Sequence, residues 1–154
     1  MSTTTRIKAK DAIDAFIADY ISPTSVIESD TTEIIVTAIT DFNDPQFRDY
    51  LMGLPVTFPL DTVRKCLAIL SAFVPDGKQR AIYSVLAQFA WEAGDDTLAE
   101  TYLTLALNED AGYSLANLLK RVFATGWERE SFVTMRTQLH PKVIEALDDT
   151  VIGR

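Results

Sequence analysis

The stretch AIYSVLAQFAWEAGDDTLAETYLTLA, residues 81–106, decides the fold class of this chain. Apolar side chains in its first half recur three and four positions apart, and they define one face of a helix that stops at Gly94. Apolar residues resume at the same spacing after Asp95 or Asp96, either of which can cap a second helix. Two helices joined by so short a turn must lie antiparallel. The sequence therefore predicts a helical hairpin over residues 81–108.

This hairpin matches the tetratricopeptide pattern, in which pairs of helices repeat about every 34 residues. Gly94 takes the place of the turn glycine, and Ala87, Ala99 and Ala106 take the small positions where the two helices cross. Helix axes approach to about 8–10 Å only where such side chains are short. A second turn glycine, Gly126, follows close to one repeat later. We therefore expect an all-α protein of tetratricopeptide-like antiparallel helical hairpins stacked into one compact domain.

The rest of the chain indicates further helices of a single domain spanning residues 1–154. Residues 33–40 are ambiguous, because their β-branched content suits a strand, whereas Asp30 and Glu33 form a capping box that suits a helix. We expect a helix there and keep the strand as the alternative. The expected elements are N-terminal helices over 8–21 and 31–42, helical hairpins over 44–74, 81–108 and 113–139, and a C-terminal helix over 141–149 that begins at Pro141.

The net charge of −8 is unevenly distributed along the 154 residues. Between residues 81 and 119 the chain carries carboxylates and no cation: Glu92, Asp95, Asp96, Glu100, Glu109 and Asp110. Such a surface repels phosphate backbones, which argues against nucleic-acid binding. The acidity either keeps the domain soluble or offers an acidic face to a basic partner, as a mimic of DNA would.

Three features that the sequence lacks indicate the cellular compartment: a membrane-spanning run, a signal peptide and a pair of cysteines. No apolar run approaches the roughly 20 residues that span a bilayer, and residues 1–10 lack the apolar stretch of a signal peptide. The lone cysteine, Cys66, cannot form an internal disulfide. We expect a cytoplasmic protein that does not bind a membrane.

Two stretches of the chain also resemble a known family. They are LAQFAWEAGDDTLA at 86–99 and ALNEDAGYSLANLL at 106–119. Together they are similar to the C-terminal part of an actinobacterial domain-of-unknown-function family, the four-one-nine-two type. In that family an alanine-tryptophan and glycine-aspartate hairpin leads into an aspartate-proline-glycine-tyrosine-serine-leucine-alanine motif. Upstream, Arg48-Asp49 and FVPD at 73–76 fit further landmarks of the same family.

The resemblance covers residues 41–126, with two departures. Ala111 replaces the proline of the motif, and the family's long N-terminal half is absent here. Short versions of this kind look similar to proteins encoded by actinobacterial phages. Because the family has no established activity, the resemblance implies a fold and an origin but no catalytic residues.

The sequence offers no catalytic, cofactor or metal site that we can identify. One histidine and one cysteine cannot build a zinc site, and no glycine-rich phosphate loop occurs. The carboxylates of Glu92, Asp95 and Asp96 gather at a predicted turn, where capping explains them more simply than an ion. His140 is interpreted as a cap or surface residue and Cys66 as a small core residue. We therefore expect a protein that is not an enzyme.

A partner-binding groove can be argued more positively. In tetratricopeptide hairpins the first helix of each pair lines a concave groove. The residues expected at this groove and the adjoining turn are Ser84, Gln88, Trp91, Glu92, Asp95 and Asp96. Trp91 is the informative one: it is either an anchor for a partner or a core residue packed on Leu115 or Leu119.

These observations favour a non-enzymatic protein–protein interaction module, with a host protein as the partner if the chain is phage-encoded. The alternative is an acidic inhibitor or DNA mimic that blocks a basic nucleic-acid-binding protein. Basic residues such as Arg129 and Arg136 could instead meet the acidic face of a second copy, so a homo-oligomer stays open. The sequence does not name the partner.

Overall fold

The computed structural model describes residues 3–23, 30–40 and 45–149, and every regular element in these ranges is helical. The elements are α1 (Thr3–Ile21), α2 (Thr31–Thr40), α3 (Pro45–Gly53), the 3₁₀ helix η1 (Leu54–Val56), α4 (Leu60–Ser71), α5 (Arg80–Glu92), α6 (Asp96–Glu109), α7 (Ser114–Ala124) and α8 (Arg129–Asp149). The all-α prediction is confirmed. None of the described helices is both long and apolar enough to cross a membrane.

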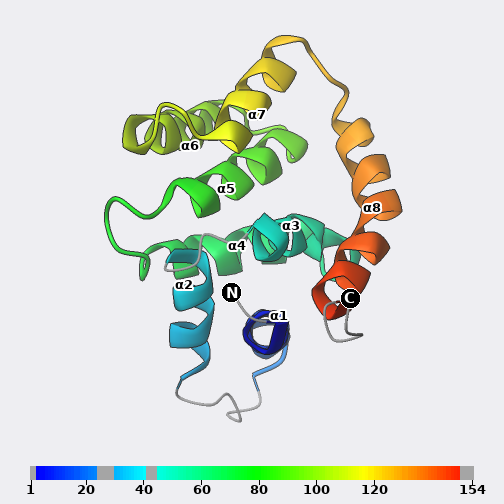
Figure 1. Cartoon of the computed structure of the whole chain (residues 1–154). Coiled ribbons are helices and arrows are strands. Elements are labelled where there is room, and N and C mark those ends of the chain that lie inside the picture. The colour runs from blue at the N-terminus through cyan, green and yellow to red at the C-terminus, as the bar shows by residue number, and fades with distance from the viewer. Residues whose placement is uncertain (1–2, 24–29, 41–44, 150–154) are drawn as a thin grey trace.

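The ambiguous segment 33–40 lies within helix α2, so the helical alternative is the correct one. Its buried residues include Ile35, Ala38 and Ile39, which share one helical face, and α2 packs beside α1 (Figure 1). Packing of this face outweighs the weak preference of β-branched residues for strands. The helix end predicted at 42 and the hairpin start predicted at 44 lie outside the described residues, which omit 41–44.

Helix α5 lies at the centre of the molecule. It contacts α3, α4, α6, α7 and α8, and Figure 1 shows it between the α6–α7 layer and the α3–α4 layer. From Ala81 to Ala90 it has buried residues on all its faces, as expected of a helix covered on all sides. Its residues belong to both hydrophobic clusters, one formed mainly with α1–α4 and the other with α6–α7. Cys66 of α4 lies in the first cluster and is fully buried, as predicted.

The hairpin predicted over residues 81–108 is formed by α5 and α6, which contact each other along their length. Gly94 turns the chain with a φ of +82°, a left-handed conformation that favours glycine. Asp95 then caps α6, because its side chain accepts a hydrogen bond from the backbone N–H of Leu98 at 3.2 Å. Both turn signals were visible in the sequence.

The two flanking hairpins predicted over 44–74 and 113–139 do not form. Helix α3 lies closest to α8 and α5 rather than to α4, and α8 runs away from α7 along α3 toward α1 (Figure 1). The turn that includes η1 separates α3 from α4 and lets them diverge. Regular stacking of tetratricopeptide hairpins is therefore not the arrangement of these segments.

The break predicted at Pro141 is also wrong, because α8 continues through it to Asp149. A proline inside a helix costs roughly 3 kcal/mol through a lost hydrogen bond and a steric clash. Buried residues lie on both sides of this proline, His140 before it and Leu147 after it. We attribute the continuity of the helix to these contacts, which hold both halves of α8 against the rest of the molecule.

Candidate functional site

An apolar cleft of about 220 Å³ opens between α3, α5 and α8. Its apolar lining comes from Met52 of α3 and from Phe132, Met135, Leu139 and Val143 of α8. Its polar lining comes from Asp49 of α3, Gln88 of α5, and Arg136 and His140 of α8. The cleft is thus a mostly apolar concavity with a few polar groups, the usual character of a binding site.

Helix α8 supplies one wall of the cleft as a single stripe. Phe132, Met135, Leu139 and Val143 follow one another at intervals of three or four residues, which places them on one helical face. Phe132 is buried, whereas Met135 is 38% and Leu139 46% exposed. Val133, 51% exposed on the same helix, does not line the cleft. The stripe was missed in the sequence because we expected the helix to end before Pro141.

Arg136, which lines the cleft, is one member of a buried ion pair. The guanidinium of Arg136 bonds the carboxylate of Glu92, and their side chains are only 7% and 2% exposed. Arg136 also donates from Nε to the carbonyl oxygen of Met52 at 2.7 Å. Gln88 donates from Nε2 to the same Glu92 oxygen at 3.3 Å. These contacts join α3, α5 and α8 and leave the charge of Arg136 neutralised within the chain.

His140 lines the cleft and is buried, contrary to the prediction of a cap or surface residue. Its imidazole packs against Gly53, where a methyl group on the glycine would lie 1.8 Å from Nδ1. The ring of Tyr50 lies 5.4 Å away, and the Tyr50 hydroxyl donates to Asp14 at 2.6 Å. Burial lowers the pKa of His140, although Asp14 opposes the effect.

Three of the predicted groove residues prove to be buried. Ser84 is fully buried and donates to the carbonyl oxygen of Arg80, while Gln88 and Glu92 are covered by α8. The open groove expected along the first helix of the hairpin is therefore absent at these positions, because other helices pack on that face of α5. Only Gln88 among the three reaches the cleft.

Trp91 packs within the chain rather than standing free. Its ring stacks on Phe123 of α7 with centroids 4.5 Å apart and planes tilted by 12°. The guanidinium carbon of Arg129 lies 4.5 Å from the Trp91 ring centroid. The core alternative is thus the closer one: Trp91 packs against the hydrophobic cluster that includes Leu115 and Leu119, and Phe123 is the ring on which it stacks. Trp127, at the following turn, is about half exposed.

Asp95 and Asp96, the last of the predicted site residues, are exposed but paired. Asp95 caps α6 and lies 3.8 Å from a guanidinium nitrogen of Arg64. Asp96 bonds Arg129 at 2.5 Å. Among the described residues, no three histidine, cysteine or acidic side chains come together in a group that could hold a metal ion.

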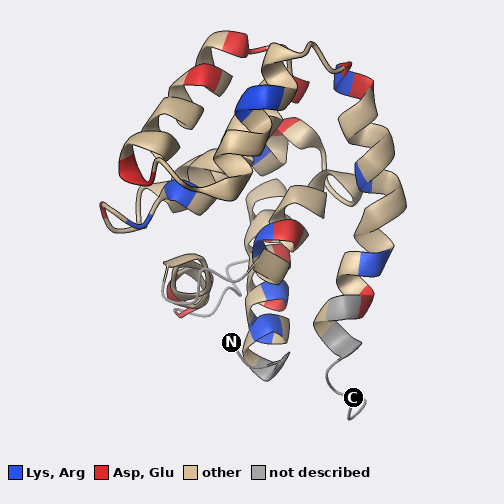
Figure 2. Ribbon diagram, turned by 45° about the horizontal axis from the view of Figure 1, so that its top comes forward, with Lys and Arg blue, Asp and Glu red and all other residues tan. Residues whose placement is uncertain are grey.

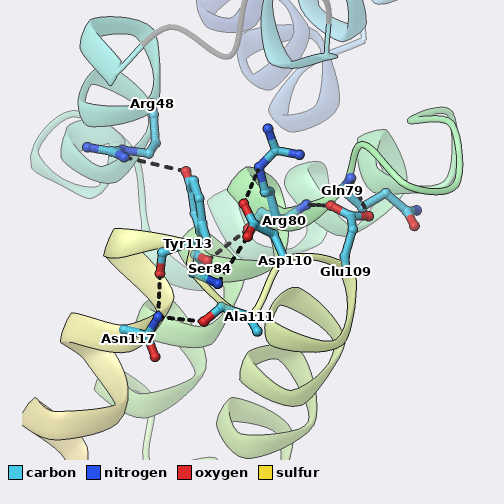
Figure 3. A network of polar contacts seen from close by, with 10 residues as sticks. Arg48, Gln79, Arg80, Ser84, Glu109, Asp110, Ala111, Tyr113 and Asn117 are labelled. Atoms are coloured by element: carbon cyan, nitrogen blue, oxygen red, sulfur yellow. Dashed lines mark hydrogen bonds and ion pairs between the residues drawn. The ribbon is translucent and has the colours of Figure 1, made fainter.

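Arg48 and the 106–119 motif, two of the family landmarks found in the sequence, meet at a second place, shown in Figure 3. Arg48 of α3 donates to the hydroxyl of Tyr113 at 3.4 Å, and Arg80 pairs with Asp110 at 3.5 Å. Glu109 accepts hydrogen bonds from the backbone N–H groups of residues 79 and 80, at 2.9 and 2.5 Å, and so caps α5. Each of these side chains has a partner inside the chain, which indicates a network that holds α3, α5 and the α6–α7 turn together.

No curated protein and no solved structure matches the chain. The family model described as "Domain of unknown function (DUF4192)" matches residues 3–130. The match extends well beyond the 41–126 resemblance, includes the N-terminal helices, and ends as α8 begins. With most of its length matched, the chain belongs to the family described as Domain of unknown function (DUF4192).

Proposed function

We propose that this chain is a non-enzymatic protein–protein interaction module whose partner inserts apolar side chains into the cleft between α3 and α8. The observation that carries the proposal is the exposure of Met135 and Leu139 beside a concave apolar surface. Exposed apolar residues scattered singly are ordinary, but a group that rims a concavity is typical of an interaction site. Met52 and Met135 both line the cleft, and flexible methionine side chains adapt readily to an incoming surface.

The size of the cleft favours a protein side chain over a small molecule. Its volume of about 220 Å³ lies below the roughly 300–1,000 Å³ of pockets that enclose drug-sized ligands. The state of the nucleophilic candidates supports a non-enzymatic role. Burial raises the pKa of the Cys66 thiol to about 11, so the thiolate that would act as nucleophile is scarce near neutral pH.

The alternative function, an acidic inhibitor or DNA mimic, receives less support from the charges. Of the carboxylates between residues 81 and 119, five have a partner within the described part of the chain. Glu92, Asp95, Asp96 and Asp110 pair with arginines, and Glu109 caps α5. A mimic of phosphates needs carboxylates that are free to meet a basic partner. Acidic and basic positions also lie close together on several helices in Figure 2.

A matched pair of substitutions on α8 tests the proposed function. Leu139→Asp places a charge in the cleft wall, whereas Val133→Asp places the same charge on the same helix outside the cleft. We expect partners captured from cell lysate by the wild type to be retained by Val133→Asp and lost by Leu139→Asp. Equal retention by all three proteins, with unchanged circular dichroism, would show that the cleft is not the binding site.

A further inference from the structure

We propose that the occupant of the cleft is a cationic amphipathic helix of a partner protein. This partner class rests on the proposed function of the cleft, and three properties of the site lead to it: its length, its free polar atoms and the charge of the molecule around it.

The length of the cleft wall favours a helix as the occupant. Its accessible part, from Met135 to Val143, covers about 12 Å at 1.5 Å per residue, because Phe132 is buried. An amphipathic helix lays side chains at positions i, i+3 or i+4, and i+7 along such a groove.

Apart from His140, the polar atoms that the cleft offers to an occupant are acceptors. Asp49 is about half exposed at the rim and pairs with Arg48, its neighbour in sequence, at 3.2 Å. Gln88 donates its amide N–H to Glu92, so the carbonyl oxygen of this side chain remains for an occupant. Arg136 is the only Lys or Arg among the described lining residues, and Glu92 and the Met52 carbonyl already bind it. An occupant therefore gains by bringing donors and positive charge.

The charge of the whole molecule acts in the same direction. A net charge of −8 attracts a cationic segment and accelerates its approach, most strongly at low ionic strength. The same charge makes a second copy of this chain an unfavourable occupant, since two molecules of like net charge repel each other. Electrostatic attraction thus raises the rate at which the cationic helix meets the protein, and apolar contact with the α8 stripe then keeps it bound.

The test uses the full chain and designed peptides as probes. The first peptide is an amphipathic Leu/Lys sequence of about 18 residues, which is long enough to form a helix when bound to the protein. The second replaces every lysine by glutamate, and the third is a Leu/Lys isomer whose scrambled order destroys the apolar face. Binding of fluorescent peptides is followed by anisotropy at two salt concentrations. We expect the Leu/Lys helix to bind at least about tenfold more tightly than either control peptide, and less tightly at high salt.

Substitutions show whether that binding occurs in the cleft. Leu139→Asp adds a negative charge that would strengthen purely electrostatic attachment, so a loss of about tenfold or more reports apolar contact. Val133→Asp adds the same charge outside the cleft and should not weaken binding. Asp49→Asn should weaken binding about two- to fivefold, the range of an exposed ion pair. Glu100→Gln removes an equal charge from α6 and should have a smaller effect.

The outcomes separate this inference from the proposed function. If Leu139→Asp weakens peptide binding but the Leu/Glu helix binds as tightly as the Leu/Lys helix, the cleft remains a binding site and the inference of a cationic occupant is wrong. Capture of a lysate partner in a Leu139-dependent way, with no binding of any peptide, overturns the helical class. If neither peptides nor captured partners respond to Leu139→Asp, both the inference and the proposed function fail. A shift to a dimer in light scattering that Leu139→Asp abolishes would identify a second copy as the occupant and contradict the inference.

Discussion

Arg136 and Glu92 show how much the surroundings of one ion pair determine its energetic weight. Their side chains are 7% and 2% exposed, whereas the Arg129–Asp96 pair, which also joins α8 to the α5–α6 hairpin, is 35% and 58% exposed. Removing one member of a buried pair leaves the other charge without water or a counter-charge. Removing one member of an exposed pair leaves a charge that water solvates.

We therefore expect Glu92→Gln to destabilise the protein by about 3–5 kcal/mol, measured as the change in the free energy of unfolding in urea. Asp96→Asn, the matched control in the exposed pair, should cost less than about 1 kcal/mol. Similar losses for both variants would mean that burial does not distinguish the two pairs.

At the scale of elements, the approach of α8 to α3 depends on one glycine. Gly53 ends α3 with φ −87° and ψ −9°, a conformation open to any residue, so its backbone does not require glycine. Space does require it, because a methyl group there would meet three atoms of the His140 ring at 1.8–2.7 Å. Since His140 is only 4% exposed, the ring has little room to move away.

Gly53→Ala is accordingly expected to destabilise the protein by about 1–3 kcal/mol, the usual cost of overpacking. Without the clash the same change would stabilise a helix by roughly 0.5–1 kcal/mol, because alanine loses less conformational entropy than glycine. Adding His140→Ala removes the ring and should make Gly53→Ala neutral or stabilising in a double-mutant cycle of thermal or urea unfolding. Additive effects in that cycle would show that the ring is not the obstacle.

At the scale of the whole molecule, the burial of the single histidine makes the free energy of unfolding depend on pH near neutrality. Burial lowers the pKa of His140 below its ordinary value of 6.5, and Arg136 and Lys10 act in the same direction, against Asp14. The unfolded chain then binds more protons than the folded one just below pH 6.5. The contribution of neutral His140 to the free energy of unfolding is therefore complete above its unfolded-state pKa of 6.5. It is lost as the pH falls from there through the lower pKa of the folded state, by at most about 1.4 kcal/mol per pH unit.

We expect the wild type to lose more stability than His140→Gln between about pH 7.5 and about pH 5.5, a range above most carboxylate titrations. Urea unfolding at both pH values measures the difference. Because the sequence holds only one histidine, its imidazole NMR signals give the folded pKa directly. A midpoint above 6.5 would contradict the proposed effect of burial.

Local patterns in the sequence were enough to predict most of the helices, the α5–α6 hairpin, the turn at Gly94 and the cap at Asp95, but not the continuation of α8 through Pro141. Each depends on residues a few positions apart, so its signal is contained in a short window. The family resemblance was likewise visible, although the family match covers more of the chain than the motifs suggested.

The candidate site could not be predicted in the same way. Periodicity tells which face of a helix is apolar, but not which other helix covers it. The sequence therefore suggested that Gln88 and Glu92 face a groove, whereas α8 returns from a distant part of the chain and buries them. The same packing carries α8 through Pro141 and leaves Met135 and Leu139 at the rim of a cleft. Only contacts between elements remote in sequence decide these features, because burial is a property of the assembled molecule.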